Sequence, residues 1–292
     1  MSEPVIADFL AKFNSDILTR TEPVSGRVLL SQKRLVLAVD DQNKLTIPLE
    51  TIFDVAVGQV PEELDGFFDS TVTIAFRRGD GQHVAAIEGD DEKISKFATV
   101  LFKALLNGTE TTVKHPARVG GRVTDQPFVP ARLALKPQAV QFNTSDDPVK
   151  ITLAEVTEFS RSTRDVAGSM RPVLEVRHMP AGEAVLTMVA TDSKRKMGLL
   201  GRYLRLEYSE LMAELKDITV SKDEKEILVA LYSGAGQEGL SLPEIVNKDP
   251  SSVTMMLNQL QDDDLVVDTA DGTTLTPKGQ VVVSKHLEDV NV

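Results

Sequence analysis

The sequence contains one module twice, and this duplication limits the folds that the chain can adopt. Residues 26–39 (GRVLLSQKRLVLAV) return in weaker form in residues 121–135, first as GRV and then as ARLAL. Three further pairs of segments follow in the same order: 47–55 with 151–159, 71–76 with 172–178, and 83–89 with 184–191. We therefore interpret the chain as two copies of one unit of roughly one hundred residues, followed by a C-terminal remainder.

Each copy predicts several short strands and a closing helix. Runs of Val, Leu and Ile alternate with turn residues, which is typical of antiparallel strands. Apolar residues then follow helical spacing from Ile94 to Leu105 in the first copy, and at about residues 193–216 in the second. A small antiparallel sheet covered by one helix is typical of the pleckstrin-homology (PH) or GRAM superfold. The predicted fold is α+β and multidomain, with two tandem PH/GRAM-like antiparallel β modules, each closed by a C-terminal helix.

Two shorter segments flank the first copy. Apolar residues near the N-terminus fall at helical spacing and predict an amphipathic run that packs on the first module: Val5, Ile6, Phe9, Leu10 and Phe13. Residues 109–118 (TETTVKHPAR) are polar and contain Pro116, so we expect a linker there.

The remainder has a different pattern from the two copies. It predicts a helix at residues 223–232, a second helix that begins after Ser241 and a third helix that ends at Leu260. An alternating segment at 265–276 and a last helix at 280–288 follow. Three helices, a hairpin and a helix in this order predict a winged helix-turn-helix. The expected domains are residues 1–108, the first module with its N-terminal segment; 109–118, the linker; 119–216, the second module; and 217–292, the winged-helix domain.

The charge distribution argues against nucleic-acid binding. The chain has a net charge of -12, and residues 217–292 carry 5 Lys and no Arg against 14 Asp and Glu. The predicted recognition helix (SSVTMMLNQLQDDD) has no basic residue, whereas DNA binding needs cations that neutralise phosphates. For this remainder we favour a protein-contact or dimerisation role, and a homodimer stays open.

No pattern for catalysis, a metal or a cofactor is present. The chain has no Cys, and its four His lack metal-ligand spacing. Residues 234–239 spell GxGxxG, but this segment follows a predicted helix, whereas a dinucleotide site requires a preceding strand. The sequence also lacks an 18-residue apolar run and a signal peptide. We therefore expect a non-enzymatic, cytoplasmic protein without cofactors and without membrane insertion.

Basic residues gather on the predicted closing helix of the second module: Lys194, Arg195, Lys196, Arg202 and Arg205. At 100° per residue, Arg195 and Arg202 project roughly opposite the apolar Met197, so we expect both to face solvent. Arg161 and Arg164 flank a predicted loop at residues 160–172 and could extend the same basic surface. Such a surface is either simply solvated or binds an acidic protein or a phosphate, for which Arg supplies bidentate geometry.

At this point the sequence resembles the CheF family of archaeal taxis adaptors. The resemblance covers most of the chain and is carried by four segments: residues 6–13 (IADFLAKF), 26–38 (GRVLLSQKRLVLA), 197–216 (MGLLGRYLRLEYSELMAELK) and 222–234 (KDEKEILVALYSG). It implies a cytoplasmic adaptor at the base of the archaellum. Such an adaptor would couple the phosphorylated response regulator CheY to the switch proteins of the archaellum motor.

The resemblance does not identify which residues contact which partner. From charge alone we expect CheY to dock near the basic residues named above, because a phosphorylated receiver domain is usually acidic. Two alternatives stay open. A transcription regulator would require salt-dependent DNA binding, and a PH-like lipid-binding protein would sediment with anionic vesicles, although the first module lacks a basic loop cluster.

Overall fold

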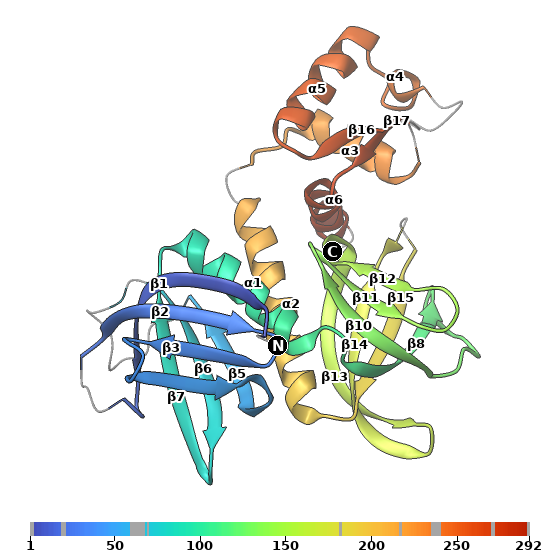
Figure 1. The fold of residues 1–292 in the computed structure, drawn as a ribbon. Coiled ribbons are helices and arrows are strands. Elements are labelled where there is room, and N and C mark those ends of the chain that lie inside the picture. The colour runs from blue at the N-terminus through green and yellow to red at the C-terminus, as the bar shows by residue number, and fades with distance from the viewer. Residues whose placement is uncertain are drawn as a thin grey trace. The chain divides into compact units, whose positions relative to one another are not determined.

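The computed structural model describes residues 3–18, 22–58, 68, 70–180, 183–215, 218–234, 241–269 and 272–290. The chain divides into two compact units (Figure 1). Unit 1 comprises Met1–Glu110, Arg132–Leu135 and Thr191–Leu206. Unit 2 comprises Thr111–Ala131, Lys136–Ala190 and Glu207–Val292. The segment 234–239 falls largely outside the described residues, and so does Asp271 of the turn expected at Asp271-Gly272.

Unit 1 is built on a seven-stranded antiparallel sheet with the order β4-β3-β2-β1-β7-β6-β5. Its elements are β1 (Val5–Ser15), β2 (Val24–Ser31), β3 (Arg34–Ala38), β4 (Lys44–Pro48), the 3-10 turn η1 (Leu49–Thr51), β5 (Ile52–Val57), β6 (Thr71–Arg78), β7 (Gly81–Glu88) and α1 (Asp91–Leu106). Helix α1 packs on β1, β5, β6 and η1 (Figure 1). Its predicted stripe from Ile94 to Leu105 is buried, and the Asp90 side chain accepts a hydrogen bond from the Lys93 amide and caps the helix.

The N-terminal segment is a strand, so its predicted helical character is wrong. Strand β1 pairs with β2 from Val5 to Phe13. Its inward side alternates two small alanines with two phenylalanines, and Leu10 on the outward side is 75% exposed. The weakly apolar alanines hid the period-two pattern, and the exposed Leu10 mimicked a helical one. Pairing with a neighbouring strand decided the structure, as it often does for short apolar runs.

The second sheet repeats the topology of the first. Its elements are β8 (Glu110–Val119), β9 (Arg122–Val123), β10 (Val129–Lys136), β11 (Ala139–Asn143), β12 (Val149–Thr152), the turn η3 (Leu153–Glu155), β13 (Val156–Val166), β14 (Ser169–His178) and β15 (Val185–Thr191). The order is β12-β11-β10-β8-β15-β14-β13, with β9 beside β8. Each strand except β9 therefore has a counterpart at the same place in the first sheet, as the internal duplication predicts.

Residues 109–118 form most of strand β8, although the sequence predicts a linker there. Thr111, Val113 and Ala117 are buried, so the segment carries an inward face that its polar composition concealed. Strand β8 holds the place in the second sheet that β1 holds in the first. The linker prediction is therefore wrong for these residues, while the division into three domains stays a prediction.

The C-terminal residues follow the predicted order of elements. They are α3 (Lys222–Tyr232), α4 (Leu242–Ile245), α5 (Pro250–Asp262), β16 (Val266–Thr269), β17 (Gly272–Leu275) and α6 (Pro277–Val290). Ser221 and Glu224 form a reciprocal capping box at the start of α3. One apolar cluster contains Ile227 of α3, Val253 of α5 and Val281 of α6, together with Ala154 of η3. None of the described helices is long and apolar enough to cross a membrane.

Helix α2 (Lys194–Glu214) differs from the predicted closing helix of the second module. Its residues up to Leu206 belong to unit 1, and those from Glu207 belong to unit 2. In unit 1 the fully buried Tyr203 ring lies 5.7 Å from the ring of Phe102 on α1. In unit 2 the ring of Tyr208 meets Phe159 of β13 edge-on at 6.4 Å. The apolar stripe of α2 therefore serves two cores.

Replacement of Tyr203 tests this packing. Tyr203→Ala should lower the free energy of unfolding by about 3–5 kcal/mol, because it removes a fully buried ring. The exposed Arg205→Ala on the same helix should change it by no more than about 0.5 kcal/mol. Urea denaturation measures both values, and hydrogen exchange in α1 should rise only in the Tyr203 variant. Unchanged exchange in α1 would contradict the assignment of this half of α2 to unit 1.

Candidate functional site

The five basic residues of α2 all lie in unit 1, but they do not form one solvent-facing surface. Arg195 and Lys196 are half-buried, whereas Lys194, Arg202 and Arg205 are exposed. Helical periodicity gave the side of the helix on which each residue lies. It could not show that elements of the first copy lie beside the first turn of α2.

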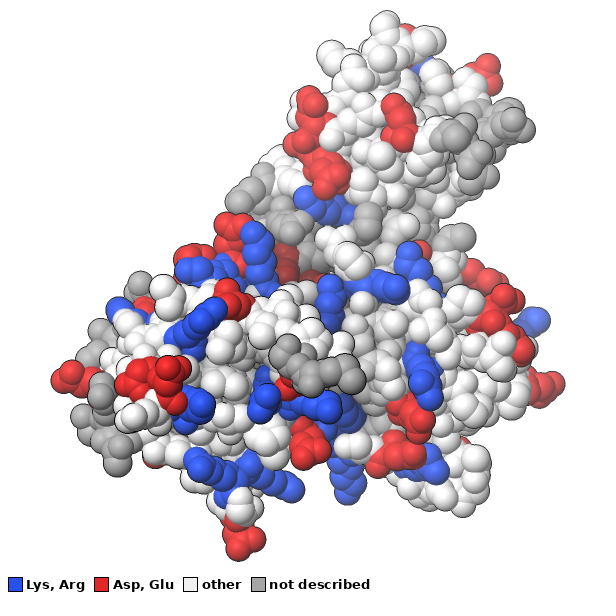
Figure 2. All heavy atoms as spheres, viewed as in Figure 1, with Lys and Arg blue, Asp and Glu red and all other residues white. Residues whose placement is uncertain are grey.

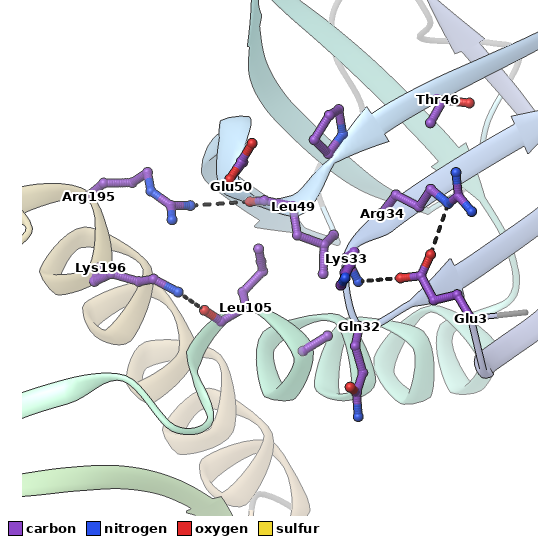
Figure 3. Close-up of a pocket in the computed structure, with 12 residues that line it drawn as sticks. Glu3, Gln32, Lys33, Arg34, Thr46, Leu49, Glu50, Leu105, Arg195 and Lys196 are labelled. Atoms are coloured by element: carbon purple, nitrogen blue, oxygen red, sulfur yellow. Dashed lines mark hydrogen bonds and ion pairs between the residues drawn. The ribbon is translucent and has the colours of Figure 1, made fainter. Parts of the chain in front are cut away.

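Arg195 binds main-chain carbonyls instead of facing solvent. Its Nη1 atom donates to the carbonyl oxygen of Leu49 at 3.3 Å (Figure 3), and also to that of Ile52. These carbonyls lie in and directly after η1, and the Leu49 carbonyl also accepts a hydrogen bond from the Ile52 amide, so Arg195 adds a second, charged donor there. Burial lowers the pKa of Arg195, and the charge of nearby Glu50 acts in the opposite direction.

Lys196 caps the end of another helix. Its Nζ atom donates to the carbonyl oxygen of Leu105, one of the last carbonyls of α1 (Figure 3). The final carbonyls of a helix have no partner within the helix and carry a partial negative charge, so a cation is favourable there. Burial lowers the pKa of Lys196, and the positive charge of Arg195 lowers it further.

Arg202 forms an ion pair with a carboxylate. Its Nε and Nη2 atoms lie 3.0 Å from the two carboxylate oxygens of Asp54 on β5. The two side chains are 46% and 39% exposed, so solvent weakens the pair. Neither Lys194 nor Arg205 forms an ion pair within the part of the chain that the structure describes.

A groove of about 830 Å³ opens beside Arg195 and Lys196 within unit 1. Besides these two side chains it is lined by the N-terminal segment, the β2–β3 turn, the end of β4 with η1, and the end of α1: Glu3, Gln32, Lys33, Arg34, Thr46, Pro48, Leu49, Glu50, Ala104 and Leu105 (Figure 3). Its walls therefore come from parts of the chain that are almost two hundred residues apart in sequence.

One carboxylate already binds at the β2–β3 end of this groove. Glu3 accepts hydrogen bonds from the Ser31 hydroxyl at 2.7 Å and the Lys33 amide at 2.9 Å. It also pairs with Arg34 at 3.1 Å. The hydrogen bond from Ser31, with the help of Arg34 and Lys33, holds the pKa of Glu3 below its ordinary value despite partial desolvation.

Arg161 and Arg164 lie on β13 in unit 2, not on a loop. Arg164 donates through Nε and Nη2 to Glu175 on β14, at 2.9 and 2.8 Å, and Ser162 donates to the same oxygen. Burial alone would raise the pKa of Glu175, but these hydrogen bonds and the charges of Arg164 and Arg118 hold it below its ordinary value. The two arginines therefore belong to a different unit from the five basic residues of α2.

Comparison with known proteins places the chain in a family. The model of the family described as "Archaeal Chemotaxis signal transduction system protein F" matches residues 5–210. The chain belongs to this CheF family. A second model, of a domain of unknown function, matches residues 219–288.

Two curated relatives from Halobacterium salinarum match over nearly their whole length. Taxis protein CheF2 is 47% identical over 292 residues, which is 100% of both chains. Taxis protein CheF1 is 28% identical, with 99% of each chain covered. The solved structure of inner membrane complex sub-compartment protein 3 from Toxoplasma gondii matches 40% of this chain and 83% of its own. Its identity of 12% and TM-score of 0.26 are too low to show a shared fold.

The CheF chain also contains a pair of histidines, His178 buried and His115 half-buried, that sequence reasoning missed. The hydroxyl of Thr187 lies 2.7 Å from Nδ1 of His115 and 2.9 Å from Nε2 of His178. The two rings stack with centroids 5.8 Å apart. The sequence shows these histidines as scattered, because only the neighbouring places of β8, β15 and β14 in the sheet bring them together. Within the described part of the chain, no group of three or more acidic, His or Cys residues could hold a metal ion.

Because Arg195 and Arg202 have different surroundings, we expect their replacement to lower the free energy of unfolding by different amounts. Arg195→Met should destabilise the CheF chain by about 1.5–3 kcal/mol, since half-buried carbonyls lose a charged donor. Arg202→Met should cost no more than about 1 kcal/mol, because an exposed ion pair contributes little. Urea denaturation of the two variants provides the comparison. Equal losses of unfolding free energy would show that the hydrogen bonds from Arg195 to carbonyls stabilise the chain no more than an exposed ion pair does.

The histidine pair predicts a loss of stability in mild acid. Burial and the neighbouring His115 lower the pKa of His178 from 6.5 to about 4. Between these values the unfolded chain binds a proton that the folded chain does not, so stability present above pH 6.5 falls toward pH 4, by about 3 kcal/mol. Denaturation midpoints from pH 7 to 4 measure the slope. His178→Gln should flatten this slope, and a slope equal to that of the parent chain would exclude His178 as the cause.

Proposed function

We propose that this chain is a non-enzymatic adaptor that couples the phosphorylated response regulator CheY to the switch complex of the archaellum motor. The observation that carries the proposal is the family match over residues 5–210, together with a full-length relative named as a taxis protein. An adaptor of this kind acts in the cytoplasm at the base of the archaellum. It needs separate surfaces for two partners and no catalytic group.

The architecture supports such a division of labour. Two antiparallel sheets of the same topology, which we assign to PH/GRAM-like modules, are followed by helices and a hairpin that we assign to a winged helix. In this mechanism a partner that binds more tightly when phosphorylated shifts how the other surfaces engage the motor. The coupling free energy then depends only on the difference in affinity between the two states of CheY.

The charges of the C-terminal helices disfavour the transcription-regulator alternative. Helix α5 has no Lys or Arg. On the face shown in Figure 2, the region of α3 to α5 displays acidic side chains and little basic surface. DNA binding releases counterions through phosphate contacts made by cations, and this surface offers few of them. The lipid-binding alternative has little support either, because no loop among the described residues of unit 1 carries a cluster of exposed basic side chains.

We propose that CheY docks on the exposed basic face of α2. Of the five basic residues expected there, Lys194 and Arg205 form the centre of this face. These residues are three helical turns apart and lie on the same side of the helix, about 16 Å from each other. Arg195, Lys196 and Arg202 contribute charge nearby but already have partners in unit 1. Arg161 and Arg164 belong to the proposed CheY-binding surface only if unit 2 also contacts CheY.

A pull-down of CheY tests both the function and the face. Phosphoryl-mimicking beryllofluoride on CheY should increase its recovery with the full chain. The double variant Lys194→Glu/Arg205→Glu should weaken this binding about tenfold, because reversed charges repel an acidic partner. The matched control Lys44→Glu/Arg78→Glu carries the same charge change on β4 and β6 and should bind as the parent does.

Two results would contradict these proposals in different ways. Absence of phospho-dependent recovery would refute the coupling function. If Met255→Asp abolishes binding while the double variant does not, CheY docks on the C-terminal helices instead. Met255 is 69% exposed on α5, and Ile245 and Val267 are also exposed, so these helices offer an apolar surface for that outcome.

A further inference from the structure

The groove of unit 1 contains two cations that no carboxylate neutralises directly. Within the described part of unit 1, Arg195 and Lys196 donate to the neutral carbonyls of Leu49, Ile52 and Leu105 and form no ion pair. Buried or half-buried charges in proteins are normally paired, because desolvation of an unpaired charge is costly. Desolvation lowers the pKa of both side chains, and for Arg195 the charge of Glu50 offsets this only in part.

The groove as a whole is locally positive on a chain that is globally acidic. Four basic side chains line it, against the two carboxylates of Glu3 and Glu50. Glu3 already neutralises Arg34. Lys33 is exposed at the rim and has no ion-pair partner among the residues described. The net charge of the chain is -12, so this concave positive surface is not explained by composition.

The contacts of Glu3 show that the residues lining the groove can bind a carboxylate. A hydroxyl, a main-chain amide and a guanidinium converge on its carboxylate at 2.7, 2.9 and 3.1 Å. The Nζ atom of Lys196 uses one of its three hydrogens on Leu105, which leaves two donors for a second carboxylate. No aromatic side chain is among the lining residues described, so a nucleotide base has no stacking partner.

We propose that this groove binds an acidic, extended segment of a partner protein, with carboxylates of the segment held by Lys33 and Lys196. A volume of about 830 Å³ is large for a single inorganic anion and suits several residues of a peptide. Its half-buried cations lie in a concavity, where a narrow peptide fits better than a flat membrane surface. The inference is independent of CheY docking, which concerns the outward residues Lys194 and Arg205.

Binding of a labelled peptide to the full chain tests the proposal. Fluorescence anisotropy should detect binding of the hexapeptide (Glu-Gly)3, and the matched (Gln-Gly)3 should bind at least about tenfold more weakly, because it lacks the charges. Lys33→Met/Lys196→Met should lower the affinity for (Glu-Gly)3 about tenfold. The control Lys12→Met/Lys96→Met removes two exposed lysines of unit 1 outside the groove and should change it less than twofold.

Further measurements separate folding and other ligands from the proposed contact. Lys33→Glu lies on an exposed turn and should weaken binding even if Lys196→Met unfolds the chain. Hydrogen exchange at residues 31–34 and 193–196 should slow when the peptide binds. Equal binding of both peptides, or equal effects of groove and control variants, would overturn the proposal. So would displacement of the peptide by inorganic phosphate, or binding to phosphatidylglycerol vesicles without binding to the peptide.

Discussion

The packing of the first half of α2 against unit 1 is the interaction on which the rest of the structure depends. Tyr203 completes the core beside Phe102, and Arg195 donates to the carbonyls of Leu49 and Ile52. Both residues come more than one hundred positions after the last strand of the first sheet. A unit that ended at residue 108 would therefore leave an apolar ring and several carbonyls uncovered, and the duplicated module is not self-sufficient.

In the second copy a different helix covers the corresponding turn. The turn η3 holds the place of η1, and in unit 2 it packs against α6 from the C-terminal helices. Ala154 of η3 shares an apolar cluster with Val281 and Val283 of α6. In each unit a short turn before the edge strand is covered by a helix from later in the chain.

The repetition of one sheet topology could be predicted from the sequence, because the duplicated segments follow one another in the same order along the chain. The errors arose where a pattern had two physical explanations. Ala7 and Ala11 concealed the alternation of β1, and polar residues around Pro116 concealed that of β8. The helix bearing Arg195 was predicted, but its surroundings come from the other copy, so periodicity could not show that the side chain binds carbonyls. Likewise no spacing along the chain indicates that His115 and His178 share one hydroxyl.

The division of α2 between the units has a consequence for the order in which the chain folds during synthesis. Domains generally fold as they leave the ribosome, starting from the N-terminus. The last segment of unit 1, which contains Tyr203, ends at Leu206. Every strand of the second sheet is synthesised before this segment is complete. Two sets of strands with similar sequences and the same order are thus present before either core is complete. The weaker similarity of the second copy reduces the chance that a strand joins the wrong sheet.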